Sequence, residues 1–188
     1  MKKIIHNIHG FSLLEITVAT AVFGSIVLIA AGIFQMAAES QRSALASQNI
    51  QESLSYALEV ISKEIRSAVK NNINCNLGGG ISNNIFNVIP GGAGLYFANK
   101  NKDCVFYRVE NGRLMIKRNA LDFPLTPDEI KVNSINFYIK DNPYGAVSGL
   151  IQPAVSLVLD VEANYGINKK QTMKIQTSLS SRYYEQAD

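Results

Sequence analysis

An uncharged run of 23 consecutive residues, most of them apolar, lies between Glu15 and Glu39. In a helix rising about 1.5 Å per residue this run is about 35 Å long, enough to cross the hydrocarbon core of a bilayer. Small and hydroxyl residues inside the run, such as Gly24 and Thr20, are compatible with a spanning helix, which satisfies its backbone internally. The run therefore predicts one membrane-spanning helix near the N-terminus.

The residues that flank the run indicate its orientation and distinguish it from an ordinary signal peptide. Lys2 and Lys3 precede it, so the positive-inside rule places the N-terminus in the cytoplasm and the residues beyond about 40 outside. The run is followed by only a weak signal-peptidase site, at Ala37-Ala38. Glu15 lies a short way inside the apolar segment, where an unpaired carboxylate costs at least about 2.5 kcal/mol. Such a residue needs a partner.

The residues directly before the spanning run, Gly10 to Glu15 with the sequence GFSLLE, resemble the processing motif of type IV prepilins and type II secretion pseudopilins. In that family a membrane peptidase cleaves after the glycine on the cytoplasmic side, and the new N-terminal phenylalanine is N-methylated. The resemblance implies a leader peptide of residues 1–10, cleavage between Gly10 and Phe11, and N-methylphenylalanine at Phe11. The mature chain then has 188 − 10 = 178 residues.

The resemblance also implies a partner for Glu15, the α-amino group of Phe11 on a neighbouring subunit. An ion pair of this kind, formed in a low dielectric, would select the register in which subunits assemble. The alternative is a plain signal anchor that happens to contain Glu15. The chain departs from major pilins, which commonly carry a proline near the middle of the apolar helix. Here the first proline is Pro90, and glycine weakens a helix by about 1 kcal/mol without breaking it, so melting near Gly24–Gly32 is left open.

Apolar residues continue at helical spacing beyond the run. They recur at intervals of three or four residues, which is typical of one helix stripe: Ile50, Leu54, Leu58, Ile61, Ile65 and Val69. We therefore expect one helix over residues 11–70. Residues 11–38 are its transmembrane or filament-core part, and residues 39–70 are an amphipathic continuation packed on a head domain of residues 71–188.

The sequence of the head domain predicts mainly β-strands. Asn111-Gly112 favours a two-residue hairpin turn between strands 104–109 and 113–118, with Tyr107 opposite Ile116. The other expected elements are strands at 95–98, 131–140 (with a phase shift near Asn133–Ser134), 154–163 and 172–183, and loops at 71–94, 121–129 and 142–153. One long N-terminal helix followed by a mostly antiparallel sheet is an α+β arrangement, and pilins have this order of elements.

No constellation of catalytic or metal-binding residues is evident in the sequence. The only histidines, His6 and His9, lie in the expected leader, so the mature chain lacks the usual general base and zinc ligand. The glycine-rich stretch at 78–80 does not match a nucleotide-binding pattern. We predict no enzyme activity, no cofactor and no metal.

The two cysteines, Cys75 and Cys104, both lie in the expected exported part, where disulfides persist. A bridge between them closes a loop of about 30 residues, worth about 3–4 kcal/mol in the chain-entropy model. The alternative is two free buried thiols.

A cluster of basic residues raises the question of nucleic-acid binding. Between residues 100 and 118 there are two acidic side chains and six basic ones: Lys100, Lys102, Arg108, Arg113, Lys117 and Arg118. A basic patch of this kind can contact DNA, but it can equally be a solvated strand face or meet an acidic neighbouring subunit. No recognisable nucleic-acid motif accompanies it.

The sequence therefore predicts a type IV pilin-like structural subunit in the bacterial inner membrane, assembled into or priming a type IV pilus or type II secretion pseudopilus. Residues 51–68 followed by a long β-rich head resemble the J-type minor pseudopilins, which favours a minor subunit. The expected partners are other pilin or pseudopilin subunits, the prepilin peptidase and methylase, the inner-membrane assembly platform and membrane lipid. Two alternatives remain: a DNA-binding pilin of a DNA-uptake pilus, and a monomeric signal-anchored envelope binding protein that keeps residues 1–10.

Overall fold

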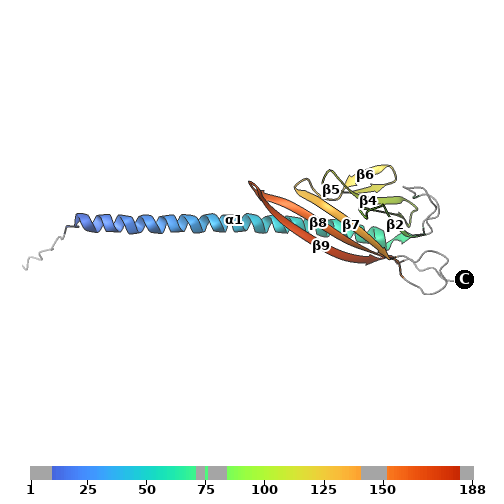
Figure 1. Ribbon diagram of the computed structural model, residues 1–188, viewed down its shortest axis with the longest axis horizontal. Coiled ribbons are helices and arrows are strands. Elements are labelled where there is room, and N and C mark those ends of the chain that lie inside the picture. Colours follow the sequence, from blue (N-terminus) through green and yellow to red (C-terminus); the bar gives the residue numbers. More distant parts are fainter. Residues whose placement is uncertain (1–9, 71–74, 76–83, 141–151, 183–188) are drawn as a thin grey trace, which may run out of the picture. The chain divides into compact units, whose positions relative to one another are not determined.

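The computed structural model of the protein describes residues 10–70, 75, 84–140 and 152–182. The chain divides after Arg42 into two compact units. One helix, α1 (Leu13–Arg66), contributes to both units, and all the described strands belong to the second (Figure 1). Of the expected leader peptide, only Gly10 falls within the described residues.

In the first unit, α1 is an unbroken helix. The carbonyl of Ser12 accepts hydrogen bonds from the backbone N–H groups of Glu15 and Ile16, at 3.0 and 3.2 Å, and so closes the first turn. The helix then continues through Gly24 and Gly32 without a break. The predicted helix is thus confirmed, with its start at Leu13 rather than at residue 11.

In the second unit, α1 buries the predicted apolar stripe. Its buried side chains recur three or four residues apart: Ala46, Ile50, Leu54, Ala57, Ile61 and Ile65. The prediction was wrong at the C-terminal end, because the helix ends at Arg66. The chain then enters strand β1 (Ala68–Val69), which pairs with strand β3. Sheet pairing of these two residues outweighs the continuing helical spacing.

The first sheet is antiparallel in every described pairing and has the order β1-β3-β4-β5-β6, with β2 also on β3. Its further strands are β2 (Phe86–Val88), β3 (Gly94–Asn99), β4 (Cys104–Glu110), β5 (Arg113–Arg118) and β6 (Leu121–Pro124). The predicted hairpin is confirmed, with Glu110 opposite Arg113 and Tyr107 opposite Ile116. Asn111 and Gly112 have φ values of +52° and +73°, the left-handed conformation that this turn requires.

Two predicted loops contain strands instead. β2 lies in the expected 71–94 loop, of which residues 71–74 and 76–83 are outside the described part. β6 lies in the expected 121–129 loop, and Pro124 at its end faces Met115. All four residues of β6 are exposed, so no buried alternation marks it in the sequence. Its edge position explains why a proline is tolerated.

The second sheet has the order β7-β8-β9 and is antiparallel. Its strands are β7 (Ile130–Lys140), β8 (Ala154–Gly166) and β9 (Lys169–Ser180). The register shift predicted near Asn133–Ser134 is confirmed, between Val132 and Ser134. β8 and β9 extend the predicted strands by three residues each at their shared turn, and β9 ends at Ser180 rather than Tyr183. Most of the predicted 142–153 loop is outside the described residues.

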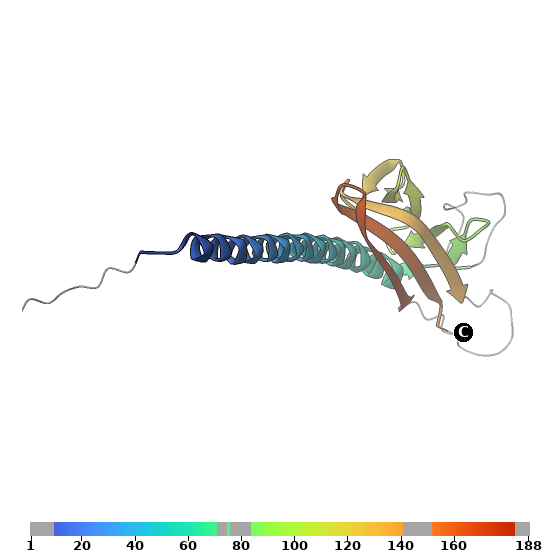
Figure 2. The same cartoon turned by 60° about the vertical axis from the view of Figure 1, so that its left-hand side comes forward.

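Both sheets lie beside the C-terminal part of α1 (Figure 2). Apolar side chains of the helix and of both sheets form one core. The alternation along β8 places five side chains in this core: Val155, Leu157, Leu159 and Val161, which are fully buried, and Ala163, which is 6% exposed. The first sheet contributes another set: Leu95, Phe97, Val105, Tyr107, Leu114 and Ile116. The α+β prediction is confirmed, with one long N-terminal helix packed against antiparallel sheets. The sequence predicted one sheet, whereas the described strands form two.

Candidate functional site

The predicted cleavage position lies in irregular backbone just before α1. Gly10 and Phe11 are both exposed, and Phe11 retains 78% of its accessible surface. Peptidases act on accessible, non-helical segments, and the backbone at these two residues is of that kind. The helix begins only at Leu13.

Glu15 lies in the first turn of α1, where a carboxylate interacts favourably with the positive end of the helix dipole. Its side chain is exposed, and within the described part of the chain it forms no ion pair. The neighbours it would need inside a membrane are therefore not supplied by the described residues of its own chain.

The apolar surface of the first unit is almost wholly uncovered. None of the helix's most apolar window is buried, and Leu28 and Phe34 expose 76% and 75% of their surfaces. Covering a side chain of this size stabilises by about 1.5–3 kcal/mol. This helix, alone among the described residues, is long and apolar enough to cross a membrane.

The hydroxyl groups along this helix are satisfied within it. Thr17 donates to the carbonyl of Leu14 at 2.8 Å, and Ser25 donates to that of Val22 at 2.7 Å. Thr20 donates to carbonyls of the preceding turn at 3.0 Å. Such back-bonding leaves these polar side chains compatible with a hydrocarbon surrounding.

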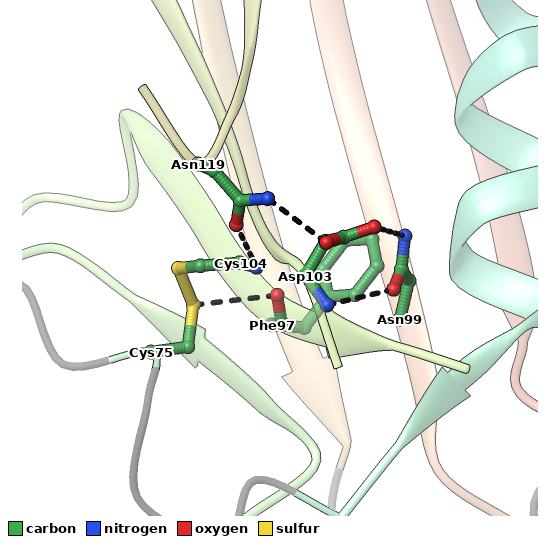
Figure 3. The surroundings of a disulfide bond; sticks show 6 residues. All are labelled: Cys75, Phe97, Asn99, Asp103, Cys104 and Asn119. Atoms are coloured by element: carbon green, nitrogen blue, oxygen red, sulfur yellow. Dashed lines mark hydrogen bonds between the residues drawn. A yellow bond between two sulfur atoms is a disulfide. The ribbon is translucent and has the colours of Figure 1, made fainter. Parts of the chain in front are cut away.

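The structure contains the predicted disulfide between Cys75 and Cys104, with the two Cα atoms 5.0 Å apart (Figure 3). The bridge fixes residue 75 to the start of β4, and the alternative of two free thiols is contradicted. The Sγ of Cys75 is 3.3 Å from the carbonyl oxygen of Phe97. Because a disulfide sulfur carries no proton, this is a packing contact rather than a hydrogen bond.

A small polar network supports the disulfide on the side of β4, and the sequence analysis did not identify it. Asn119 accepts from the backbone N–H of Cys104 at 3.1 Å and donates to Asp103 at 2.8 Å (Figure 3). The side chain of Asn99 accepts from the backbone N–H groups of Asn101 and Asp103. These bonds hold the β3–β4 turn and the end of β5 around Cys104.

The three arginines of the basic cluster are paired with acidic side chains. Arg108 contacts Glu110 at 2.6 Å and Asp122 at 2.8 Å, and these hydrogen bonds raise its pKa and lower that of Asp122. Arg113 contacts Asp128 at 2.6 Å. Arg118 pairs with Glu64 of α1, whose side chain is only 14% exposed.

The acids in three of these pairs, Asp122, Asp128 and Glu64, lie outside the 100–118 window in which the excess of basic residues was counted. The structure therefore neutralises much of that excess. The lysines of the cluster remain: Lys100 and Lys102 are exposed at the β3–β4 turn, and Lys117 is half-buried on β5. The cluster is not a continuous positive surface.

Tyr107 is buried in the core, and its hydroxyl has no hydrogen-bond partner among the described residues. Burial raises the pKa of this phenol, so the hydroxyl is protonated at neutral pH. Its ring stacks on Phe97 at 6.2 Å between centroids. The strand alternation predicted the ring's position but not the unsatisfied hydroxyl.

We expect Tyr107→Phe to leave the free energy of unfolding unchanged or to raise it by up to about 1 kcal/mol, because it removes a buried donor without a partner. Chemical denaturation of the native and variant chains measures this. Phe97→Leu, which removes the aromatic contact, is the matched control and should destabilise. A loss of more than about 1 kcal/mol in Tyr107→Phe would mean that the hydroxyl is hydrogen-bonded.

Comparison with protein-family models, with curated proteins and with solved structures finds no match to this chain.

Proposed function

We propose that this protein is a type IV pilin-like structural subunit, of the minor class, that is inserted in the bacterial inner membrane. From there it assembles into, or primes, a type IV pilus or type II secretion pseudopilus. The observation that carries the proposal is Glu15, which has no ion-pair partner among the described residues. It lies in the first turn of α1, four residues after Phe11, and the 23 residues that follow it are uncharged and uncovered.

The proposed mechanism assigns a role to each part of the N-terminal segment. Lys2 and Lys3 keep the leader in the cytoplasm during insertion, and Gly10 admits the prepilin peptidase. The apolar helix holds the subunit in lipid until the assembly platform extracts it. Glu15 then neutralises the α-amino group of Phe11 on a neighbouring subunit while the exposed apolar side chains pack between helices.

The N-terminus of the protein from its native bacterium tests this proposal. We expect intact-mass and N-terminal analysis to find a chain that begins at N-methylated Phe11. An uncleaved Met1, or an unmodified N-terminus created after residue 38, would contradict the proposal. An uncleaved Met1 would instead favour a monomeric, signal-anchored binding protein.

We expect the protein not to bind DNA, because the arginines of the basic cluster are paired with carboxylates. Retention of the purified chain on immobilised duplex DNA at low and high salt measures this. The contrary result has two parts. The native chain is retained at low salt and less so as the salt concentration rises, and the variant with Lys100, Lys102 and Lys117 all changed to Gln is not retained. That pair of results would favour the DNA-binding pilin.

A further inference from the structure

The turn between β8 and β9 presents an apolar side chain directly to solvent. Gly166 pairs with Lys169, so the turn consists of Ile167 and Asn168, and Asn168 adopts a positive φ of 56°. Ile167 is 92% exposed, more than any other large apolar residue described. Two-residue turns are usually built from glycine, asparagine and other polar residues, so the turn itself does not explain an isoleucine.

Contacts within the second unit show which way this turn points. Near the turn, the hydroxyl of Ser43 on α1 donates to the side chain of Gln171 at 3.3 Å. Just beyond the far end of β9, the backbone N–H of Arg182 donates to the carbonyl of Arg66 at 3.1 Å. β9 therefore runs in the same direction as residues 43–66 of the helix (Figure 1). The turn lies past Ser43, on the side away from Arg66.

This end of the second unit is tied closely to the apolar run. Ser43 follows Ala38, the last residue of the run, by five residues, which span at most about 18 Å even when fully extended. Four residues of strand, about 13 Å, separate Gln171 from Ile167. This upper limit on the distance between Ala38 and Ser43 applies to any arrangement of the two units. When residues 16–38 span a bilayer, Ser43 must stay near the membrane surface.

The residues next to Ile167 suit a lipid surface better than a protein partner. The exposed side chains next to Ile167 in the chain are polar, namely Asn164, Asn168, Lys169 and Lys170, and Tyr165 is half-buried against the core. Lys170 lies 2.9 Å from Glu162, whose side chain is only 13% exposed. A lone apolar side chain bordered by lysines fits the boundary between acyl chains and anionic headgroups.

We propose that the β8–β9 turn is a second membrane contact of the inserted subunit. Ile167 enters the headgroup layer of the bilayer, and Lys169 and Lys170 lie at its phosphates. A single isoleucine would not hold a free protein on a membrane, but the spanning helix tethers the turn at a high effective concentration. The inference rests on the membrane insertion within the proposed function and does not depend on filament assembly.

The experiment uses tryptophan as a probe, because the chain contains none. Three full-length variants are reconstituted in vesicles of phosphatidylcholine and phosphatidylglycerol, with and without brominated acyl chains. Ile167→Trp tests the turn. Tyr138→Trp is the matched control, an exposed aromatic position on β7 far along the sheet from the turn. Phe23→Trp reports whether the apolar helix is inserted.

We expect the fluorescence of Ile167→Trp to shift to shorter wavelength on vesicles, and brominated lipid to quench it several-fold more than Tyr138→Trp. Equal, weak quenching of these two variants, with strong quenching of Phe23→Trp, overturns the inference but leaves membrane insertion intact. A blue shift of Ile167→Trp without quenching would mean that protein covers the turn, and this also overturns it. Weak quenching of Phe23→Trp would contradict the proposed membrane insertion itself.

Discussion

The Glu15→Ala variant should be cleaved and inserted in the membrane like the native protein, yet it should not enter a filament. The uncharged run of residues 16–38 is unchanged, and alanine at position 15 makes the start of the helix more hydrophobic, so insertion is not impaired. What it lacks is the carboxylate that we propose neutralises the α-amino group of a neighbouring Phe11. Removing one partner of a buried ion pair costs about 3–5 kcal/mol. The affinity of each subunit contact should therefore fall at least about 100-fold.

Membrane fractionation, N-terminal mass and recovery of sheared filaments separate the three steps. Glu39→Ala is the matched control, because it removes a carboxylate from the other end of the same apolar run. That variant should assemble normally. Normal incorporation of Glu15→Ala into filaments would refute the proposed role of Glu15. Failure of both variants to insert would show only that acidic residues at the ends of the run affect insertion.

The elements that could be predicted from the sequence are those whose structure depends on nearby residues alone. The Asn111-Gly112 turn fixes the β4–β5 register by itself, because a two-residue hairpin turn with the right twist needs residues in the left-handed backbone conformation. The helix stripe from Ile50 to Ile65 follows from spacing alone. The disulfide was predictable because the chain has two cysteines and both lie in the expected exported part.

Features that depend on distant parts of the chain could not be predicted in this way. Arg118 is neutralised by Glu64, which is 54 residues earlier, so a count of charges within a short window misses the pair. The division of the strands into two sheets depends on how each packs around the helix, and alternation along one strand carries no information about this. β6 buries nothing, so its residues show no pattern.

The structure adds a different kind of information at the N-terminal site than it does in the head domain. Gly10 and Phe11 were singled out by a resemblance, and Glu15 first as a carboxylate inside the apolar segment. In the structure, irregular backbone precedes the helix, the helix begins at Leu13, and the apolar surface is uncovered. None of these features requires a neighbour to form. A neighbour is nevertheless needed to cover the apolar side chains. The function proposed for this segment therefore depends on contacts that form only in a membrane or a filament.

Replacing both cysteines with serine should cost the protein about 3–4 kcal/mol of its free energy of unfolding, because the unfolded chain loses a cross-link that closes about 30 residues. The effect should be seen in the second unit, where the bridge fixes Cys75 to β4 beside the core residue Phe97. Denaturant unfolding of the full chain, followed by tyrosine fluorescence, measures the loss. Helix α1 should keep its helical circular dichroism.

Reduction provides the matched control for the cysteine variant. Dithiothreitol should destabilise the native protein as much as the double replacement does, and it should leave the Cys75→Ser/Cys104→Ser variant unchanged. If reduction had no effect on the native protein, the cross-link would not contribute to stability. Two alkylatable thiols in native protein that has been denatured without reductant would show that the bridge does not form in the cell.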